Sequence, residues 1–326
     1  IFVLGFFTDV ERISFHWPLP GYLALLVGAP VVLAAWSRRW QRGVWFTVAA
    51  GFLLGLGYYA MAASPALRTG LADNKFYPRN FIGWEPLAQA VREELAQMPA
   101  DSRLLADSFK VGAQLGFQLA DADIAVLPHA LNDRHGRTAQ LAQWQLLSSG
   151  RAEVPQLLVI NPADQRYRDL LARYHRICGW VGALPPPRTV SVDQGRQRFL
   201  LLRLPAGGLD GPCVTPAMAW VDTPLPGQVA DGVLAVRGWA FKDGVGLAGV
   251  ELLVNGQPAA QARYGRSYDV RPVWPQSNDP AHPHVGFDAE LDVAALAPGT
   301  HWLGLRLHGN DGSVEDWPEQ RLHISR

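Results

Sequence analysis

Residues 19–63 read LPGYLALLVGAPVVLAAWSRRWQRGVWFTVAAGFLLGLGYYAMAA, two uncharged apolar stretches separated by a cluster of arginines. The stretches run from Leu19 to Trp36 and from Val44 to Ala63. Because a helix rises ~1.5 Å per residue, each covers much of a hydrocarbon core that is ~30 Å thick. The pattern predicts a membrane protein with a two-helix hairpin. Two buried helices of a soluble protein are the alternative, but such helices are usually shorter and carry a polar face.

The arginine cluster predicts the orientation of the hairpin. Basic residues in short loops remain on the cytoplasmic side, so the turn from Arg38 to Arg42 is expected inside and residues 64–326 outside. Residues 1–7 (IFVLGFF) have neither a basic start nor a cleavage site, which argues against a signal peptide. We expect them to end an earlier span, and the chain to be the C-terminal part of a longer polytopic protein.

Composition narrows the partners and suggests the domains. The 29 basic and 29 acidic residues cancel, whereas binding to nucleic acid needs a basic patch or stripe, so no nucleic-acid partner is expected. About 260 residues follow the hairpin, enough for two domains of ordinary size. The expected division is a transmembrane region at 1–66, an α/β domain at 67–206, a glycine-rich linker at 207–219 and an immunoglobulin-like β-sandwich at 220–326.

The first region after the hairpin alternates helical and strand patterns. Residues 85–98 carry a helical apolar face, and apolar runs at 104–106, 124–127 and 157–160 are typical of strands buried on both faces. These runs are separated by amphipathic segments, which predicts a small mixed or parallel sheet covered by helices. The sequence contains no G-x-G-x-x-G, P-loop or G-x-S-x-G motif, so no cofactor is expected.

The last region has the period of a β-sandwich. Residues 234–239, 287–293 and 301–308 alternate, and residues 250–254 run into Asn255-Gly256, a strong hairpin signal. Six or seven short strands over about 100 residues fit an immunoglobulin-like sandwich. Four tryptophans offer a platform for stacking on sugars, although core packing is expected for at least two of them: Trp239, Trp274, Trp302 and Trp317.

Several segments carry a resemblance to a known family. Residues 16–22 (HWPLPGY) stand at the entrance of the first apolar stretch, residues 83–88 (GWEPLA) follow the second, and Asn132-Asp133-Arg134 precedes Gln140 and Trp144. Together they resemble bacterial polytopic glycosyltransferases of family 39 (GT-C type), which include protein mannosyltransferases and the lipid A aminoarabinose transferase. The resemblance covers roughly residues 1–206. The final region is similar to an immunoglobulin-like appendage of some members, at Gly238-Trp239-Ala240, Asp269-Val270 and Gly286-Phe287.

The resemblance implies an enzyme that moves a sugar from a polyprenyl-phosphate carrier to a glycan, lipid or protein acceptor of the cell envelope, with inversion at the anomeric carbon. It also implies the bacterial inner membrane as location, with residues 64–326 in the periplasm. The family's essential acidic residues lie in an earlier extracytoplasmic loop that this chain does not contain, so no catalytic residue is assigned and the chain alone is expected to be inactive. The alternative hypothesis is a membrane-anchored, non-enzymatic carbohydrate-binding or scaffold protein.

Polar residues just before the first apolar stretch are candidates for contacts with the carrier. Arg12 or His16 would contact its phosphate and Trp17 its sugar or lipid, with Asp9 and Glu11 beside them. The alternative is an interfacial anchor with solvated neighbours, since tryptophan commonly occupies that depth. Solvation is also expected for three basic residues after the second stretch: Arg68, Lys75 and Arg79.

The two cysteines and the histidines complete the candidate residues. Cys178 and Cys213 are predicted to form a disulfide, because an even cysteine count without metal spacing on the oxidising side favours a bond. Two free, packed cysteines are the alternative. The His282-Pro283-His284 segment is expected to be a loop, since no cysteine or carboxylate set accompanies it, and no metal site is expected. Structural hydrogen bonds are expected for His129 and His135.

Overall fold

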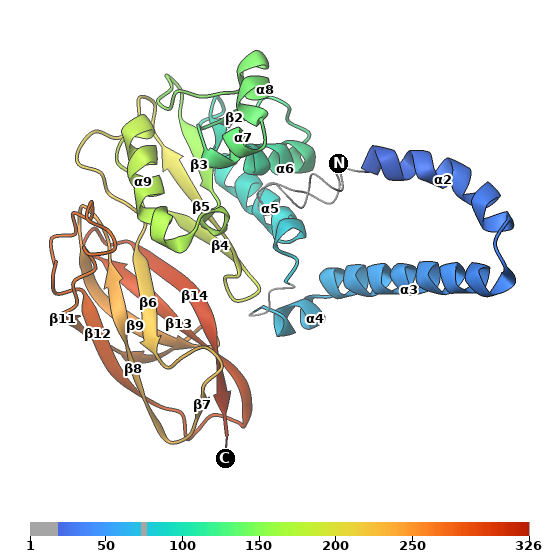
Figure 1. Cartoon of the computed structure of the whole chain (residues 1–326). Helices are drawn as coiled ribbons and strands as arrows, with labels where there is room; N and C mark the ends of the chain where they lie inside the picture. Colours follow the sequence, from blue (N-terminus) through green and yellow to red (C-terminus); the bar gives the residue numbers. More distant parts are fainter. Residues whose placement is uncertain (1–18, 73–76, 326) are drawn as a thin grey trace. The chain divides into compact units, whose positions relative to one another are not determined.

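The computed structural model describes residues 19–72 and 77–325 (Figure 1). The chain divides into two compact units, with the boundary between Ala63 and Ser64. The first unit contains the apolar helices. The second unit contains an α/β domain and a β-sandwich, in the predicted order.

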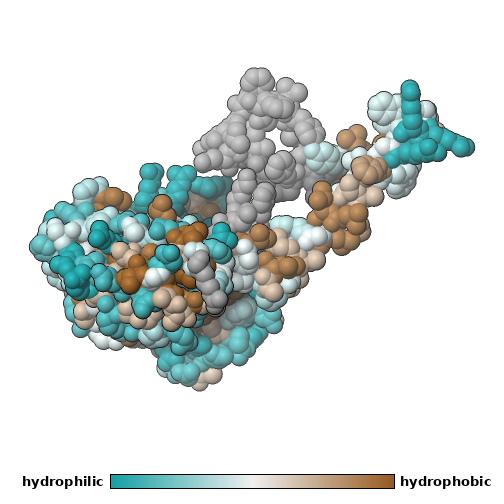
Figure 2. Space-filling view, turned by 90° about the horizontal axis from the view of Figure 1, so that it is seen from below, coloured by the Kyte–Doolittle hydropathy of each residue, from teal (hydrophilic) through white to brown (hydrophobic). Residues whose placement is uncertain are grey.

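The first unit is a pair of apolar helices, α2 (Leu19–Ala34) and α3 (Arg38–Ala63). Of the described residues, only α3 is long and apolar enough to cross a membrane, with a mean hydropathy of 1.5 in its most apolar window. Helix α2 is apolar but has 16 residues, fewer than the ~20 of an ordinary span. Apolar side chains are exposed along both helices, and hydrophobic residues dominate α3 in the space-filling view (Figure 2).

The turn of this hairpin differs from the prediction. It comprises residues 35–37, and Arg38, Arg39 and Arg42 belong to the first turns of α3 rather than to a loop. The reason is local, because the carbonyl of Ser37 accepts the backbone N–H groups of Trp40 and Gln41 and so starts the helix there. The segment at residues 1–7, expected to end an earlier span, lies outside the described residues.

The α/β domain is built on a five-stranded mixed sheet of order β2-β1-β3-β5-β4. Strands β1, β2 and β3 are parallel, whereas β5 and β4 run antiparallel to them. The strands are β1 (Arg103–Ala106), β2 (Ala125–Val126), β3 (Gln156–Ile160), β4 (Arg188–Val192) and β5 (Gln197–Leu204). The helices are α4 (Pro65–Gly70), η2 (Arg79–Phe81), α5 (Trp84–Leu95), α6 (Phe109–Leu119), α7 (Ala130–Arg134), α8 (Arg137–Gln143), η3 (Pro162–Asp164) and α9 (Tyr167–Val181).

Helices cover both faces of this sheet, as the apolar strands predicted. Successive side chains of a strand point to opposite faces. Leu105 and Leu158 therefore pack with helix α9, while Leu104 and Leu157 pack with α5 and α6. Both faces of the sheet are therefore buried, which explains why its strands are apolar throughout.

The C-terminal domain is a β-sandwich of two sheets, ordered β10-β9-β13-β14-β7 and β11-β12-β8-β6. Its strands are β6 (Met218–Thr223), β7 (Val229–Ala230), β8 (Val233–Phe241), β9 (Leu247–Val254), β10 (Gln257–Gln261), β11 (Arg263–Arg266), β12 (Gly286–Asp292), β13 (Gly299–Gly309) and β14 (Val314–Ile324). The predicted hairpin at Asn255-Gly256 joins β9 to β10, with Asn255 at φ 52°. Alternate residues of both sheets form the core between them.

The α/β domain and the sandwich share one hydrophobic core. Residues of α9 and β3 belong to the same buried cluster as Trp239, Phe241 and Trp274 of the sandwich. The segment expected as a linker is packed against α9, where Leu209 pairs with Gly182 as an isolated bridge. The two domains therefore form a continuous body rather than two modules on a flexible tether.

The tryptophans divide as the sequence suggested. Trp239 and Trp274 are 6% and 3% exposed, because α9 covers the face of the sandwich that carries them. Trp317 is half-buried and stacks with the guanidinium of Arg198, 4.6 Å from its ring centre. Core packing is thus the role of Trp239 and Trp274. The most exposed tryptophan of the sandwich is one that the sequence did not single out, Trp220 of β6.

Cys178 of α9 and Cys213 of the linking segment form a disulfide, with their Cα atoms 5.6 Å apart. We expect the purified protein to show no alkylated thiol in mass spectra without reduction. The Cys178→Ser/Cys213→Ser double variant should lose about 3 to 4 kcal/mol of unfolding free energy, because a bond that closes a loop of 35 residues restricts the unfolded chain. Urea unfolding followed by tryptophan fluorescence measures the loss. An unchanged urea midpoint would contradict the expectation.

Candidate functional site

In open α/β sheets, ligands bind at the point where the strand order reverses. Strand β1 lies between β2 and β3. The chain passes from β1 through α6 to β2 on one side of β1, and later returns as β3 on the other side. Such a reversal leaves a crevice at the carboxyl ends of the two diverging strands. Here the residues that directly follow β1 and β3 are polar, Asp107-Ser108 and Asn161. The carboxyl edge between β1 and β3 is therefore the first candidate site.

Asp107 is a buried acidic group at this edge, with 1% of its surface exposed. Its Oδ2 accepts the backbone N–H of Asn161 at 3.2 Å, which joins the ends of β1 and β3. Burial raises the pKa of its carboxyl to about 7, although the nearby Arg173 opposes the shift. Asp107 lines neither the polar crevice nor the apolar pocket that are described below. It therefore supports the site from beneath and does not reach a ligand.

Arg173 of α9 ties the same strand ends together. Its guanidinium donates to the carbonyls of Asp107 and Pro128, each at 2.7 Å, and so bridges the residues after β1 and β2. Burial lowers the pKa of Arg173 to about 10, which still leaves it charged at neutral pH. The guanidinium thus provides hydrogen-bond donors for two buried carbonyls beyond the strand ends, where no neighbouring strand can provide them.

In the Asn132-Asp133-Arg134 motif, Asn132 has a structural role. Asn132 is fully buried, and its side chain accepts the N–H of Phe109 at 2.8 Å and donates to the carbonyl of Leu127 at 3.0 Å. It thereby fixes the start of α6 against the end of β2. Asp133 and Arg134 are exposed.

His129 caps helix α7, which agrees with the expected structural hydrogen bonding. Its Nδ1 accepts the N–H of Leu131 at 2.9 Å, and its Nε2 lies 2.7 Å from the side-chain amide of Gln165. Burial lowers the pKa of His129 to about 3, with help from Arg173 and Arg176, so the ring is neutral at physiological pH. His135 instead lies at the surface beside the Phe109 ring.

A polar crevice of about 770 Å³ opens above this framework. At its centre, Lys110 of α6 bonds to Asp164 at 2.7 Å and to the side-chain oxygen of Asn80 at 3.1 Å. Asn161 donates to the other oxygen of Asp164 at 3.0 Å. Other side chains of the crevice are Tyr77, Arg79, His135 and Arg196. The crevice thus offers positively charged and hydrogen-bonding groups around one neutralised ion pair.

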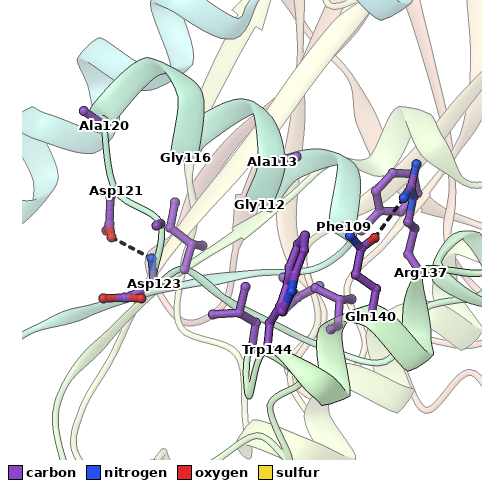
Figure 3. A pocket seen from close by; sticks show the side chains of 15 residues that line it. Phe109, Gly112, Ala113, Gly116, Ala120, Asp121, Asp123, Arg137, Gln140 and Trp144 are labelled. Carbon is purple, nitrogen blue, oxygen red and sulfur yellow. Dashed lines mark hydrogen bonds between the residues drawn. The ribbon is translucent and has the colours of Figure 1, made fainter.

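A second, mainly apolar pocket of about 870 Å³ lies along α6 (Figure 3). Gln140, from α8, and Trp144, the residue after α8, project into it. Arg137 bonds to the Gln140 side chain at 2.8 Å and lies 5.9 Å above the ring of Phe109. The indole of Trp144 is 59% exposed, so a large ring borders the opening of the pocket.

The two hollows adjoin each other at the start of α6. Phe109 lines the apolar pocket and His135 lines the polar crevice, and their ring centres are 5.5 Å apart. Lys110, next in sequence to Phe109, faces the crevice. A single helix start therefore separates a polar hollow from an apolar one, an arrangement suited to a ligand with a polar and an apolar end.

The crevice is also tied to the chain that follows α3. Asp193, in the turn between β4 and β5, accepts bonds from Arg68 and Tyr77, each at 2.6 Å, and from Thr69 at 3.2 Å. Burial raises the pKa of Tyr77, and its bond to Asp193 adds to the shift. The expected solvation of Arg68 is wrong, because only 15% of its side chain is exposed in this ion pair. Arg79 is exposed, as expected.

The sequence-based candidates are only partly placed. The residues expected to contact the carrier, Asp9, Glu11, Arg12, His16 and Trp17, lie outside the described residues, as does Lys75. Within residues 19–72 and 77–325, no group of three or more histidine, cysteine, aspartate or glutamate side chains is arranged to hold a metal ion. His282 lies in a loop, where its Nε2 is 2.6 Å from the Ser277 hydroxyl.

Sequence reasoning missed the residues at the centre of the crevice, Lys110 and Asp164. A signal was present, since Asp107-Ser108 and Asn161 directly follow two predicted strands. Nothing local, however, indicates that α6 and η3 bring Lys110 and Asp164 together across 54 residues.

Comparisons with known proteins give no family. No model of a protein family matches the chain, and no curated protein does. Among solved structures, it is similar to the endo-β-1,4-mannanase from Thermotoga petrophila at 12% identity over 34% of the chain, with a TM-score of 0.24, and it spans one fifth of that enzyme. It is also similar to fibronectin(III)-like modules of Clostridium thermocellum CbhA, at 16% identity over 33% of the chain and 94% of the module, with a TM-score of 0.23.

The buried carboxyl of Asp107 predicts a pH-dependent stability. Its pKa in the folded protein is about 7, above the ordinary 3.8, so the folded state holds a proton that the unfolded state has lost. Its contribution is fully present below about pH 4 and is lost as the pH rises through about 7. We expect the melting temperature of the wild type to fall between pH 5 and pH 8 relative to that of Asp107→Asn. Parallel melting curves for the two proteins across this range would refute the assignment.

Proposed function

We propose that this chain is the C-terminal part of a polytopic membrane glycosyltransferase, which moves a sugar from a polyprenyl-phosphate carrier to an acceptor of the bacterial cell envelope. The observation that carries the proposal is the polar crevice that adjoins an apolar pocket at the start of α6. A lipid-linked sugar has the same division, with a charged sugar phosphate at one end and a hydrocarbon chain at the other. The residues Gln140 and Trp144 of the family pattern line the apolar half.

The site is suited to binding rather than to chemistry. Lys110 is a compact cation that can approach a phosphate, while Asp164 and Asn80 hold its ammonium in place. The carboxylate of Asp164 is occupied by Lys110 and Asn161, and Asp107 is enclosed beneath, so neither is placed to act as a general base. We therefore assign to the crevice the positioning of the donor or the acceptor, and the catalytic carboxylate to another part of the full-length protein.

Three features support a membrane location with residues 64–326 on the periplasmic side. Helix α3 is apolar over a length sufficient to span a bilayer, and its side chains are exposed along that length. A second apolar helix, α2, precedes it and is joined to it by a short turn. Arg38, Arg39 and Arg42 stand at the α3 end of that turn, where cytoplasmic basic residues are usual. The disulfide between Cys178 and Cys213 requires an oxidising compartment, which the periplasm is.

The proposed topology predicts the activity of reporter fusions. Alkaline phosphatase fused after Arg326 should be active, because it folds only in an oxidising compartment. The same enzyme inserted between residues 35 and 37 should be inactive, since the basic residues keep that turn in the cytoplasm. Whole-cell phosphatase assays, normalised to the amount of fusion protein in the membrane, measure both. The reverse pattern would exclude the topology and, with it, the proposed function.

The proposed site predicts two separable defects in the full-length enzyme. Lys110→Ala should lower kcat/KM for a polyprenyl-phosphate sugar by about tenfold or more, because a hydrogen bond to a charged group is lost. Trp144→Ala should raise KM for donors with long prenyl chains while leaving short-chain donors nearly unchanged, because it removes only apolar contact. Radiolabelled transfer in membranes, with donors of several chain lengths, measures both effects.

Two controls separate these effects from general damage. Arg92→Ala removes an exposed cation from α5, and Phe117→Ala removes an exposed ring from α6 that does not line the pocket. Both should transfer sugar at the wild-type rate. If Lys110→Ala and Trp144→Ala do the same at normal membrane levels, the assignment of the two hollows is wrong.

A further inference from the structure

The outer face of the sheet β11-β12-β8-β6 carries a second site-like arrangement, on the sandwich and remote in sequence from the crevice. Alternation along the strands places Trp220 and Asp222 of β6 on this face, next to Arg237 of β8 and Asp288 of β12. Helix α9 covers the part of the face at Trp239. The part beyond Trp239 is open to solvent at Arg237 and Arg266.

Two exposed aromatic rings border the open part. Trp220 is 47% exposed and Tyr268 is 39% exposed, and both lie near Trp239. The ring of Trp220 is held by that of Tyr167, with centres 5.5 Å apart. The ring of Tyr268 lies against that of Trp239, with centres 6.3 Å apart. Each ring therefore packs against another aromatic ring while part of its surface faces solvent.

A hollow of about 470 Å³ lies beside Tyr268, and Trp220 stands outside its lining, two residues before Asp222 on β6. A glycine helps to form it, since a side chain at Gly286 would come within 3.0 Å of the Cβ of Tyr268. The lining includes two guanidinium groups and two carboxylates, all four capable of paired hydrogen bonds: Asp222, Arg237, Arg266 and Asp288. Planar polar groups beside aromatic rings are the usual composition of a pocket for a small polar ligand.

Some of the charged side chains in this hollow form ion pairs and others do not. Asp288 forms ion pairs with both Arg263 and Arg266, so its charge is compensated. Arg237 lies opposite Asp288 on the neighbouring strand, but among the described residues its guanidinium has no hydrogen bond or ion pair. A free guanidinium in a hollow is suited to a carboxylate, which it binds through two parallel hydrogen bonds.

We propose that this hollow binds an acidic saccharide, with Tyr268 packed against a sugar ring in the hollow, Trp220 packed against a neighbouring ring just outside it, and Arg237 bound to a carboxylate of the saccharide. Asp222 and Arg266 then accept and donate hydrogen bonds to sugar hydroxyls. The site is independent of the crevice at α6, so the proposal holds whether or not the chain belongs to a glycosyltransferase. Its biological consequence is a sandwich that holds the protein against an acidic glycan of the envelope.

Calorimetric titration of the protein in lipid nanodiscs tests the proposal with a short oligogalacturonate as the acidic probe and cellohexaose as the neutral one. The acidic probe should bind more tightly than the neutral one. Arg237→Ala should weaken acidic binding by about tenfold or more, and Trp220→Ala should weaken binding of either probe. Arg306→Ala is the matched control, because it removes a guanidinium from the other sheet and should leave binding unchanged.

Melting temperatures distinguish a lost contact from a lost fold. Arg237→Lys gives a second measure, since it keeps the charge but loses the paired geometry and should bind with intermediate affinity. Equal binding of the acidic and neutral probes, or wild-type affinity in both Arg237→Ala and Trp220→Ala, would overturn the proposal. Failure of these variants to transfer sugar would not bear on it, because binding alone is measured.

Discussion

The structure of residues 64–326 depends on one aromatic junction. Tyr167, the first residue of α9, contacts four tryptophan rings of the sandwich at centre distances of 5.5 to 6.2 Å. Its hydroxyl donates to the carbonyl of Ala219 at 2.7 Å, and Trp274 donates to the carbonyl of Arg168 at 2.7 Å. Rings bury large areas, and the polar atoms of this junction are satisfied, so it fixes orientation as well as contact. Because α9 also covers the α/β sheet, this junction makes two domains one body.

A second constraint joins that body to the chain that leaves α3. The β4–β5 turn contacts both the chain after α3 and the sandwich. Asp193 binds Arg68 and Tyr77, and the carbonyl of Gln194 accepts the N–H of Glu319 at 3.1 Å. Gly195 permits this approach, because a side chain there would lie 2.8 Å from the Cα of Pro318. The turn thus fixes one wall of the polar crevice, where Tyr77 lies, relative to the sandwich. A ligand in the crevice and the residues after α3 share this support.

Much of the fold could be predicted, for reasons that are local. Residues 157–160 of β3 are apolar throughout because both faces of the sheet are covered, and Asn255-Gly256 adopts the left-handed backbone of a tight hairpin. Strand β6 was not predicted, since its outward residues meet α9 or a ligand-sized hollow and break the usual alternation. The buried ion pair of Arg68 was also missed, because its partner Asp193 is 125 residues away.

The sequence by itself determined the apolar helices, the order of the α/β domain and sandwich, and the two cysteines available to pair, because these follow from runs, periods and counts. Only the tertiary structure decided which polar residues share a site. Lys110 meets Asp164, and Arg237 lies beside Asp222 and Asp288, through strand order and register. Such contacts depend on how segments that are distant in the chain pack together. No local sequence pattern indicates which of these segments will lie side by side.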